Sequence, residues 1–217
     1  MSDTLLERFG ALGTATVSDA LDKLHRQGSL LGLAPLADGQ RMAGRAFTVR
    51  YVSAQVPAGT VGDFIDQVEP GQVVVLDNDG RVDCTVWGDI LTAVAHHRGI
   101  AGTVIEGVCR DTHRALSIGY PIYSRGRFMR TGKDRVEVAE EQGPVTIGGV
   151  TVRPGDILLG DSDGVVAIPQ DCEERVLEIA EMIHAREESI LDAALGGASI
   201  AEARARYGYH DLQRAEA

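Results

Sequence analysis

Short apolar runs separated by glycines fill the first two thirds of the chain. Residues 44–53 (GRAFTVRYVS) alternate small or apolar with polar residues, whereas residues 72–77 (QVVVLD) and 102–106 (GTVIE) are mostly apolar without alternation. Alternation at period two is typical of a strand with one buried face, and a short apolar run is typical of a strand buried on both faces. These segments therefore predict a sheet of short strands.

Between these runs the apolar residues are spaced as in helices. Three segments are interpreted as helical: 16–24, 61–69 and 87–98. Thr16 or Ser18 is expected to cap the first, and Gly99 stands where the last would stop. Residues 72–106 then form a strand–helix–strand unit, which favours an α/β layer over an all-β sandwich.

Several polar or glycine-rich tetrapeptides are predicted to be turns. Asp77–Asn78–Asp79–Gly80 is expected to reverse the chain, so that residues 82–86 return as a strand. Gly148–Gly149 and Asp161–Ser162–Asp163–Gly164 each lie between two apolar runs and predict hairpins. A helix is expected at 112–118 and a strand at 120–124.

The end of the chain has a different pattern, a long helix over residues 171–195. Its apolar stripe consists of Val176, Ile179, Ile183, Ile190 and Leu191. Such a helix would be about 37 Å long, which favours packing on a neighbouring subunit. We interpret residues 1–217 as one domain in which 171–206 form a helical C-terminal arm.

Composition narrows the class of protein. The 217 residues include 32 Asp and Glu against 21 Lys and Arg, a net charge of −11, which argues against general nucleic-acid binding. We expect no membrane span and no signal peptide, and hence a cytoplasmic location. Cys84, Cys109 and Cys172 are widely spaced, so buried thiols are expected rather than disulfides or a zinc site.

The candidate chemistry lies between Trp87–Gly88–Asp89 and Arg110–Asp111. The Arg110–Asp111 pair lies just past the carboxyl end of the predicted strand at 102–106, and open α/β sheets tend to bind ligands at such strand ends. Backbone N–H groups from Gly88 through Asp89 and Ile90 to Leu91 would begin a helix and suit a carboxylate. No phosphate loop, dinucleotide fingerprint, zinc-protease motif or serine-hydrolase motif is present.

The residues alone leave two roles open for Asp111. It could cap the helix at 112–118, with Arg110 in a surface ion pair, or it could hold a hard divalent cation through oxygen. The histidines give no comparable signal, because His96 and His97 are adjacent on a helix and point in different directions.

A resemblance to a known family favours the metal. Asp89, twenty intervening residues and Arg110–Asp111 resemble the D-x20-R-D pattern of the class II aldolases that release pyruvate from 4-hydroxy-4-methyl-2-oxoglutarate and 4-carboxy-4-hydroxy-2-oxoadipate. The broader group contains RraA, a regulator of ribonuclease E. Similar segments occur in the same order at 14–21, 87–89, 105–111, 147–156 and 161–166.

The resemblance implies a swivelling-domain-like α/β/β/α sandwich with a long C-terminal helix, assembled as a homotrimer or a dimer of trimers with the site between subunits. It implies that Asp111 binds Mg²⁺ or Mn²⁺ and that Arg110 contacts the pyruvoyl oxygen. The backbone at Gly88, Asp89, Ile90 and Leu91 would receive the pyruvate carboxylate, and Asp89 would position a water or proton donor. A late-helix acid, Glu187 or Glu188, would come from the neighbouring subunit.

The expected reaction is retro-aldol cleavage of a 4-hydroxy-2-oxo acid, accompanied by decarboxylation of oxaloacetate, since both create the same enolate. Arg114 departs from the family by replacing an acidic residue three positions after Asp111, so metal affinity or substrate choice could differ. A basic segment, 125–135, could attract a di- or tricarboxylate or could simply be a solvated loop. The alternative function is inhibition of ribonuclease E, because RraA belongs to the same group.

Overall fold

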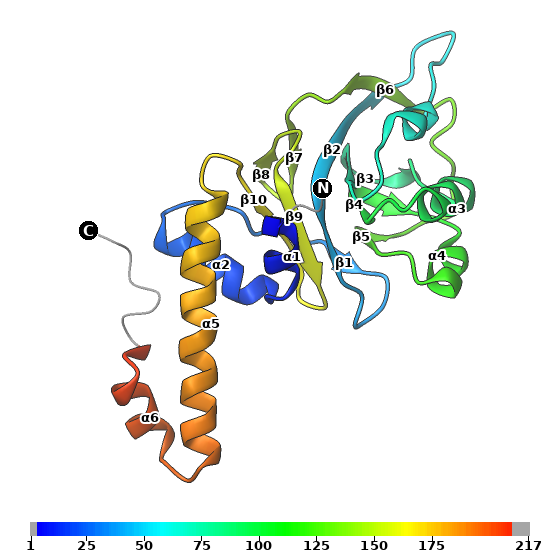
Figure 1. Cartoon of the computed structure of the whole chain (residues 1–217). Helices are drawn as coiled ribbons and strands as arrows, with labels where there is room; N and C mark the ends of the chain where they lie inside the picture. Colours follow the sequence, from blue (N-terminus) through cyan, green and yellow to red (C-terminus); the bar gives the residue numbers. More distant parts are fainter. Residues whose placement is uncertain (1–3, 210–217) are drawn as a thin grey trace.

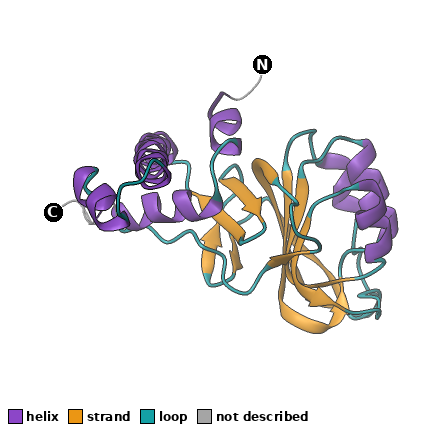
Figure 2. Ribbon diagram, turned by 90° about the horizontal axis from the view of Figure 1, so that it is seen from below, coloured by secondary structure: helices purple, strands orange, loops and turns teal. Residues whose placement is uncertain are grey.

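The long strand β2 (Met42–Ser53) organises the computed structural model, which describes residues 4–209. Its first part, from Met42 to Arg45, pairs antiparallel with β9 (Ile157–Asp161). The next part, from Ala46 to Arg50, pairs in parallel with β3 (Val73–Thr85). Because β2 pairs with different strands along its length, the sheet divides there into the two layers visible in Figure 2.

The first layer is mainly parallel. Its strand order is β5 (Ile122–Arg127), β4 (Gly102–Cys109), β3 and β2. Short β1 (Ala34–Pro35) borders β5, and β6 (Val136–Glu141) borders β2, both antiparallel. Every residue of β4 is buried, as expected for a parallel strand covered on both faces.

The second layer is antiparallel. It contains β9 and β10 (Gly164–Ile168), which form one of the predicted hairpins. The other predicted hairpin is β7 (Val145–Ile147) with β8 (Val150–Val152).

Helices cover both outer faces. On the parallel layer lie α3 (Asp89–His97) and α4 (Thr112–Ile118). On the antiparallel layer lie α1 (Thr4–Gly10), α2 (Thr14–Lys23) and α5 (Glu173–Leu195), followed by α6 (Ile200–Arg206). The predicted mixed α/β fold, in the order helix, strand, strand, helix, is therefore confirmed, and so is its long C-terminal helix (Figures 1 and 2).

Three apolar clusters fill the spaces between these layers. One, containing Leu76, Ile105 and Trp87, lies under α3 and α4. A second, containing Val75 and Val104, lies between the two layers of strands. The third joins α1, α2 and α5 to β9 and β10. Neighbouring residues of β3 and β4 thus face different clusters, which explains why their sequences are apolar without alternation.

Three local predictions were wrong. Residues 61–69 form only a short 3₁₀ helix, η1 (Asp63–Gln67). Asp77–Asn78–Asp79–Gly80 does not reverse the chain: β3 continues through it to Thr85, with positive φ at Asp79 and Gly80 and a shift in its register with β4. Neither Thr16 nor Ser18 caps α2, which begins after Gly13.

The caps and boundaries missed in the sequence depend on distant partners. The Asp161 carboxylate accepts hydrogen bonds from the N–H and the hydroxyl of Thr14, at 2.8 and 2.7 Å, and so caps α2 from the β9–β10 hairpin. Strand β6, which was not predicted, forms by pairing with β2. The thiols of Cys84 and Cys109 are buried, as expected, and Cys172 is partly buried. No helix within residues 4–209 has the length and apolar character needed to cross a membrane.

Candidate active site

Two adjacent parallel strands bring the predicted site residues together. The segment Trp87–Gly88–Asp89 follows the end of β3, and Arg110–Asp111 follows the end of β4. The Arg110 N–H donates to the Trp87 carbonyl at 3.0 Å, which ties the two segments directly. Residues separated by twenty others in the sequence therefore come together at the carboxyl edge of the sheet, where α/β folds usually bind ligands.

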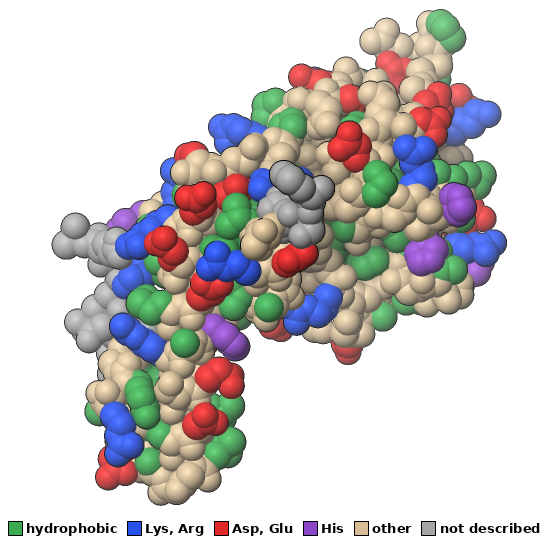
Figure 3. Space-filling model, in the orientation of Figure 1, with side chains coloured by type: hydrophobic (Ala, Val, Ile, Leu, Met, Phe, Trp, Pro, Cys, Tyr) green, Lys and Arg blue, Asp and Glu red, His purple; other side chains and the backbone are tan. Residues whose placement is uncertain are grey.

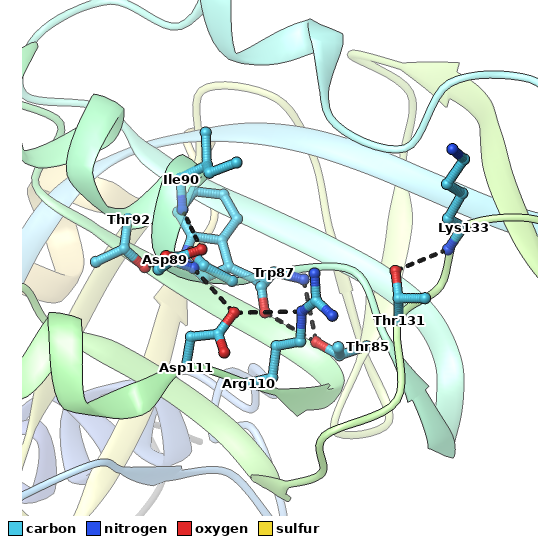
Figure 4. A network of polar contacts seen from close by, with 10 residues as sticks. Thr85, Trp87, Asp89, Ile90, Thr92, Arg110, Asp111, Thr131 and Lys133 are labelled. Atoms are coloured by element: carbon cyan, nitrogen blue, oxygen red, sulfur yellow. Dashed lines mark hydrogen bonds and ion pairs between the residues drawn. The ribbon is translucent and has the colours of Figure 1, made fainter.

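Arg110 and Asp111 lie beside each other (Figure 4), and both side chains come close to Gly88. The Arg110 Nε is 3.3 Å from the Asp111 Oδ2, and both side chains remain more than a third exposed. A Cβ at position 88 would lie 2.9 Å from that oxygen and 3.2 Å from that nitrogen. Gly88 is therefore required by the close approach of the pair, independently of its own backbone angles.

The structure answers part of the question that the sequence left open for Asp111. Its backbone is at the N-cap of α4, in the left-handed region at φ 54°, yet its side chain makes no capping hydrogen bond. The carboxylate instead forms the expected ion pair with Arg110, and its Oδ2 accepts a long, 3.4 Å hydrogen bond from the Asp89 N–H at the start of α3. Capping by this side chain was therefore wrong, the ion pair is present, and binding of a cation stays a prediction.

The first turn of α3 presents its N–H groups toward the same place. Gly88 is the N-cap and provides no side chain. The Ile90 N–H is satisfied by the Asp89 Oδ1 at 2.9 Å, and that of Asp89 by the long contact to Asp111. Among the described residues the Leu91 N–H has no acceptor. Fewer backbone N–H groups are unpaired at this helix start than the sequence predicted. The helix start still offers donors and partial positive charge to an anion.

A buried network holds this helix start in place. The Trp87 indole N–H donates to the Thr92 hydroxyl at 2.9 Å, and that hydroxyl donates to the Gly88 carbonyl at 2.8 Å. The Thr85 hydroxyl donates to the Trp87 carbonyl at 2.9 Å. Trp87 also stacks on Tyr120, with ring centroids 6.3 Å apart. Such fixed geometry suits a site that must position a ligand, because preorganised donors need not reorient.

A cavity of about 240 Å³, called here the first cavity, opens beside this network. Its walls include Gly88 to Leu91 and Arg110, and also Val61, Thr131 and Lys133 from segments outside the predicted motif. Sequence reasoning placed Lys133 only in a basic segment. The sequence indicated only a cluster of cations in an acidic chain. Lys133 comes to line the same cavity as Arg110 because the segment before β6 folds back toward it.

The oxygen donors fit a hydrated hard cation. No cluster of three or more His, Cys, Asp and Glu side chains suited to a metal occurs in residues 4–209, so Asp111 would be a single protein ligand. Mg²⁺ and Mn²⁺ suit oxygen donors, and Mg²⁺ commonly keeps several waters beside one or two carboxylates and substrate oxygens, whereas structural Zn²⁺ requires four N or S ligands. The Asp111 Oδ1, which has no hydrogen-bond partner among the described residues, could face such an ion.

Glu187 and Glu188 lie elsewhere in the same chain. They belong to α5, on the opposite outer face from α3 (Figure 1). Burial and the nearby Asp19 carboxylate raise the pKa of Glu187. Figure 3 shows acidic and hydrophobic side chains together on the part of α5 that extends beyond the strands, where Leu195 is 78% exposed. One chain therefore does not supply these glutamates to its own site, and their contribution from a neighbour stays a prediction.

The geometry defines an α/β protein in which an Arg–Asp pair and the start of a helix lie together at the carboxyl edge of a parallel sheet. The sequence profile of the RraA-like family, described as Aldolase/RraA, matches residues 14–167, and the chain belongs to that family. The matched range contains both segments of the site and ends before α5.

Curated relatives agree with this assignment. The chain is 40% identical over 215 residues to the protein DlpA of Legionella pneumophila; the match covers 96% of this chain and 35% of DlpA, so the chain spans about a third of that relative. It is 35% identical over 186 residues to a Halalkalibacterium halodurans protein provisionally named 4-hydroxy-4-methyl-2-oxoglutarate aldolase, with 85% of each covered.

Solved structures confirm the fold. An uncharacterised protein from Pseudomonas syringae is 41% identical with a TM-score of 0.88, covering 94% of this chain and 98% of that one. RraAS2 of Streptomyces coelicolor, described as an unusual member of the RNase ES inhibitor RraA family, is 26% identical with a TM-score of 0.78, covering 87% and 96%. The family thus includes proteins named as aldolases and as ribonuclease inhibitors.

Proposed function

We propose that this protein is a divalent-metal-dependent pyruvate aldolase. It cleaves a 4-hydroxy-2-oxo acid, such as 4-hydroxy-4-methyl-2-oxoglutarate, to pyruvate and a second oxo acid, and it decarboxylates oxaloacetate. The observation that carries this proposal is the Arg110–Asp111 pair, which lies beside a cavity bounded by the start of α3. The names of the curated relatives support the same class of reaction.

Binding follows from the charges that line the first cavity. The start of α3, with the free N–H of Leu91, receives the substrate C1 carboxylate. The Arg110 guanidinium then donates to the C2 oxygen, and Lys133 adds positive charge on another wall. Asp111 would hold Mg²⁺ or Mn²⁺, which when bound supplies Lewis-acid stabilisation of negative charge on substrate oxygen.

Cleavage requires two proton transfers, one from the C4 hydroxyl and one to C3. A base removes the proton from the C4 hydroxyl, the C4–O bond becomes a carbonyl, and the C3–C4 bond breaks. Its electrons pass to the C2 oxygen, where Arg110 stabilises the negative charge. Protonation at C3 then yields pyruvate. In oxaloacetate the same charge develops when the C3–C4 bond breaks with loss of CO₂.

Two groups of this chain are suited to the proton transfers. Asp89 lies at the rim of the first cavity and can orient a water against C4. Glu187 or Glu188 of another copy is the second, in a homotrimer or a dimer of trimers. The exposed end of α5 supports such packing, because Leu191 and Leu195 are 49% and 78% exposed in one chain.

The test measures pyruvate release from 4-hydroxy-4-methyl-2-oxoglutarate and from oxaloacetate, with Mg²⁺, with Mn²⁺ and with excess EDTA. We expect turnover with either ion, loss in EDTA and recovery when the ion is restored. Because free divalent ions decarboxylate oxaloacetate slowly, Asp111→Asn at the same metal concentration is the matched control. Turnover that persists in EDTA would exclude the proposed mechanism.

Inhibition of a ribonuclease is the second candidate, since the similar RraAS2 is described as belonging to an RNase inhibitor family. Asp89 favours the aldolase, because its carboxylate borders the first cavity and can orient a water for proton transfer there. A pull-down with ribonuclease E, joined to an RNA-cleavage assay, separates the two candidates. Binding that slows cleavage, in a protein that releases no pyruvate, would favour the inhibitor.

A further inference from the structure

A second cavity adjoins the first at Arg110. It also has a volume of about 240 Å³ and is lined by Cys109, Arg110, Asp111, Thr112, Arg127, Phe128 and Met129. Arg110 lines both cavities, and Asp111 lines the second. A ligand that contacts the Arg110 guanidinium in the first cavity therefore lies next to a residue that also borders the second.

Arg127 is a cation without a carboxylate partner among the described residues. It ends β5, and its guanidinium donates to the Leu36 carbonyl at 2.7 Å. That hydrogen bond fixes the side chain but leaves its charge uncompensated, unlike Arg125, which pairs with Glu106. A positioned guanidinium with free donors is well suited to bind a carboxylate.

The other walls of the second cavity are mostly apolar. Phe128 and Met129 form one side, and Met129 is 76% exposed. Burial raises the pKa of the Cys109 thiol, so this residue is uncharged at neutral pH. The cavity thus combines one cation with surfaces that suit a short aliphatic group.

This arrangement extends the proposed function and rests on it. With C1 at the start of α3 and the C2 oxygen at Arg110, the chain beyond C3 begins beside Arg110, which also lines the second cavity. We propose that the second cavity holds the fragment released on cleavage, and that Arg127 selects substrates whose C4 carries a carboxylate. Phe128 and Met129 accommodate a small apolar substituent on the same carbon.

The experiment compares two substrates that differ in that carboxylate. Cleavage of 4-hydroxy-2-oxoglutarate releases glyoxylate, and cleavage of 4-hydroxy-2-oxopentanoate releases acetaldehyde. We expect Arg127→Met to lower kcat/KM for the first about 10- to 100-fold, mainly through KM, because one charge-assisted hydrogen bond is lost. The kcat/KM for 4-hydroxy-2-oxopentanoate should change less than about threefold, since this substrate offers no C4 carboxylate to the Arg127 guanidinium.

Two further variants separate selectivity from general effects. Arg130→Met removes a neighbouring charge whose guanidinium lies 5.7 Å from the Phe128 ring centroid and lines neither cavity, so the ratio of the two kcat/KM values should be unchanged. Arg127→Lys keeps the charge and should recover part of the selectivity. Thermal unfolding of each variant identifies any loss of fold.

Exchange of the pyruvate methyl protons in D₂O with Mg²⁺ separates failure of this inference from failure of the proposed function. Exchange requires only the first cavity and should be unaffected by Arg127→Met. The proposed role of Arg127 is wrong if folded Arg127→Met lowers kcat/KM equally for both substrates, or for neither, while proton exchange persists. If the wild type neither exchanges pyruvate protons nor cleaves either substrate, the proposed function fails and this inference with it.

Discussion

Two aspartates, Asp161 and Asp111, each lie beside the start of a helix but are used in opposite ways. Asp161 accepts short hydrogen bonds from the N–H and the hydroxyl of Thr14 and a 3.0 Å bond from the Asp163 N–H. The Asp111 carboxylate makes no bond to α4, and its two contacts, with Arg110 and with the Asp89 N–H, are 3.3 and 3.4 Å long. The Asp161 carboxylate therefore stabilises the fold through its hydrogen bonds, whereas the Asp111 carboxylate can still accept further hydrogen bonds.

The difference shows that residue type and position near a helix do not assign a role. Burial raises the pKa of Asp161, but the hydrogen bonds from Thr14 and Asp163 outweigh it and lower that pKa below its ordinary value. Such satisfied carboxylates stabilise a fold. The Asp111 carboxylate, which does not cap α4 and pairs only with Arg110 at 3.3 Å, keeps the capacity to bind the cation proposed above.

Asp111→Asn should have the largest effect. We expect turnover of oxaloacetate to fall about 10³-fold or more, because the only protein ligand proposed for the cation loses its charge. The free energy of unfolding should change by less than about 0.5 kcal/mol, since the side chain makes no cap. Steady-state pyruvate release and urea unfolding measure the two quantities; near-normal turnover would place the metal elsewhere.

Arg110→Lys should lower kcat about 10²-fold, because a lysine keeps the charge but loses the planar fork that faces both Asp111 and the substrate oxygen. The measurement is kcat and KM on 4-hydroxy-4-methyl-2-oxoglutarate at saturating Mg²⁺. A rise in KM with kcat unchanged would mean that Arg110 only binds substrate and does not stabilise the developing charge.

Gly88→Ala should cost about 10- to 100-fold in kcat, since displacement of a catalytic group by about 1 Å has effects of this size. The added methyl would lie 2.9 Å from the Asp111 Oδ2, and the carboxylate has to move. Gly10→Ala is the matched control, because its φ, like that of Gly88, lies outside the left-handed region and the nearest heavy atom to an added Cβ is 4.0 Å away. Unchanged kcat in a folded Gly88→Ala protein would show that the pair need not be so close.

Asp161→Ala should have the smallest effect on activity and a measurable one on stability. Loss of the α2 cap should lower the free energy of unfolding by about 1–2 kcal/mol, while turnover per folded molecule stays unchanged. Because the folded-state pKa of Asp161 is lowered, its stabilisation is present above about pH 4 and is lost as pH falls through the folded-state value. Urea titrations of both proteins from pH 7 to pH 3 should therefore converge in acid; a pH-independent gap would contradict this.

Much of the fold could be predicted locally. The β3–α3–β4 unit, α4 and both hairpins lie close to their predicted positions, since periodicity and glycines report on a segment's own geometry. The failures involve long-range pairing. Residues 77–80 have the composition of a turn, yet parallel pairing with β4 resumes at Arg81, so residues 78–80 form a bulge within β3 and not a reversal of the chain.

The sequence by itself determined the layered α/β class and the spacing that puts Asp89 and Arg110–Asp111 at the ends of neighbouring strands, because a parallel sheet aligns such ends. Only the tertiary structure decided which aspartate caps a helix, that Lys133 and Arg110 line the same cavity, and that Arg127 borders a second one. These facts depend on contacts between residues far apart in the chain, and side-chain directions at such contacts are fixed only when the layers pack.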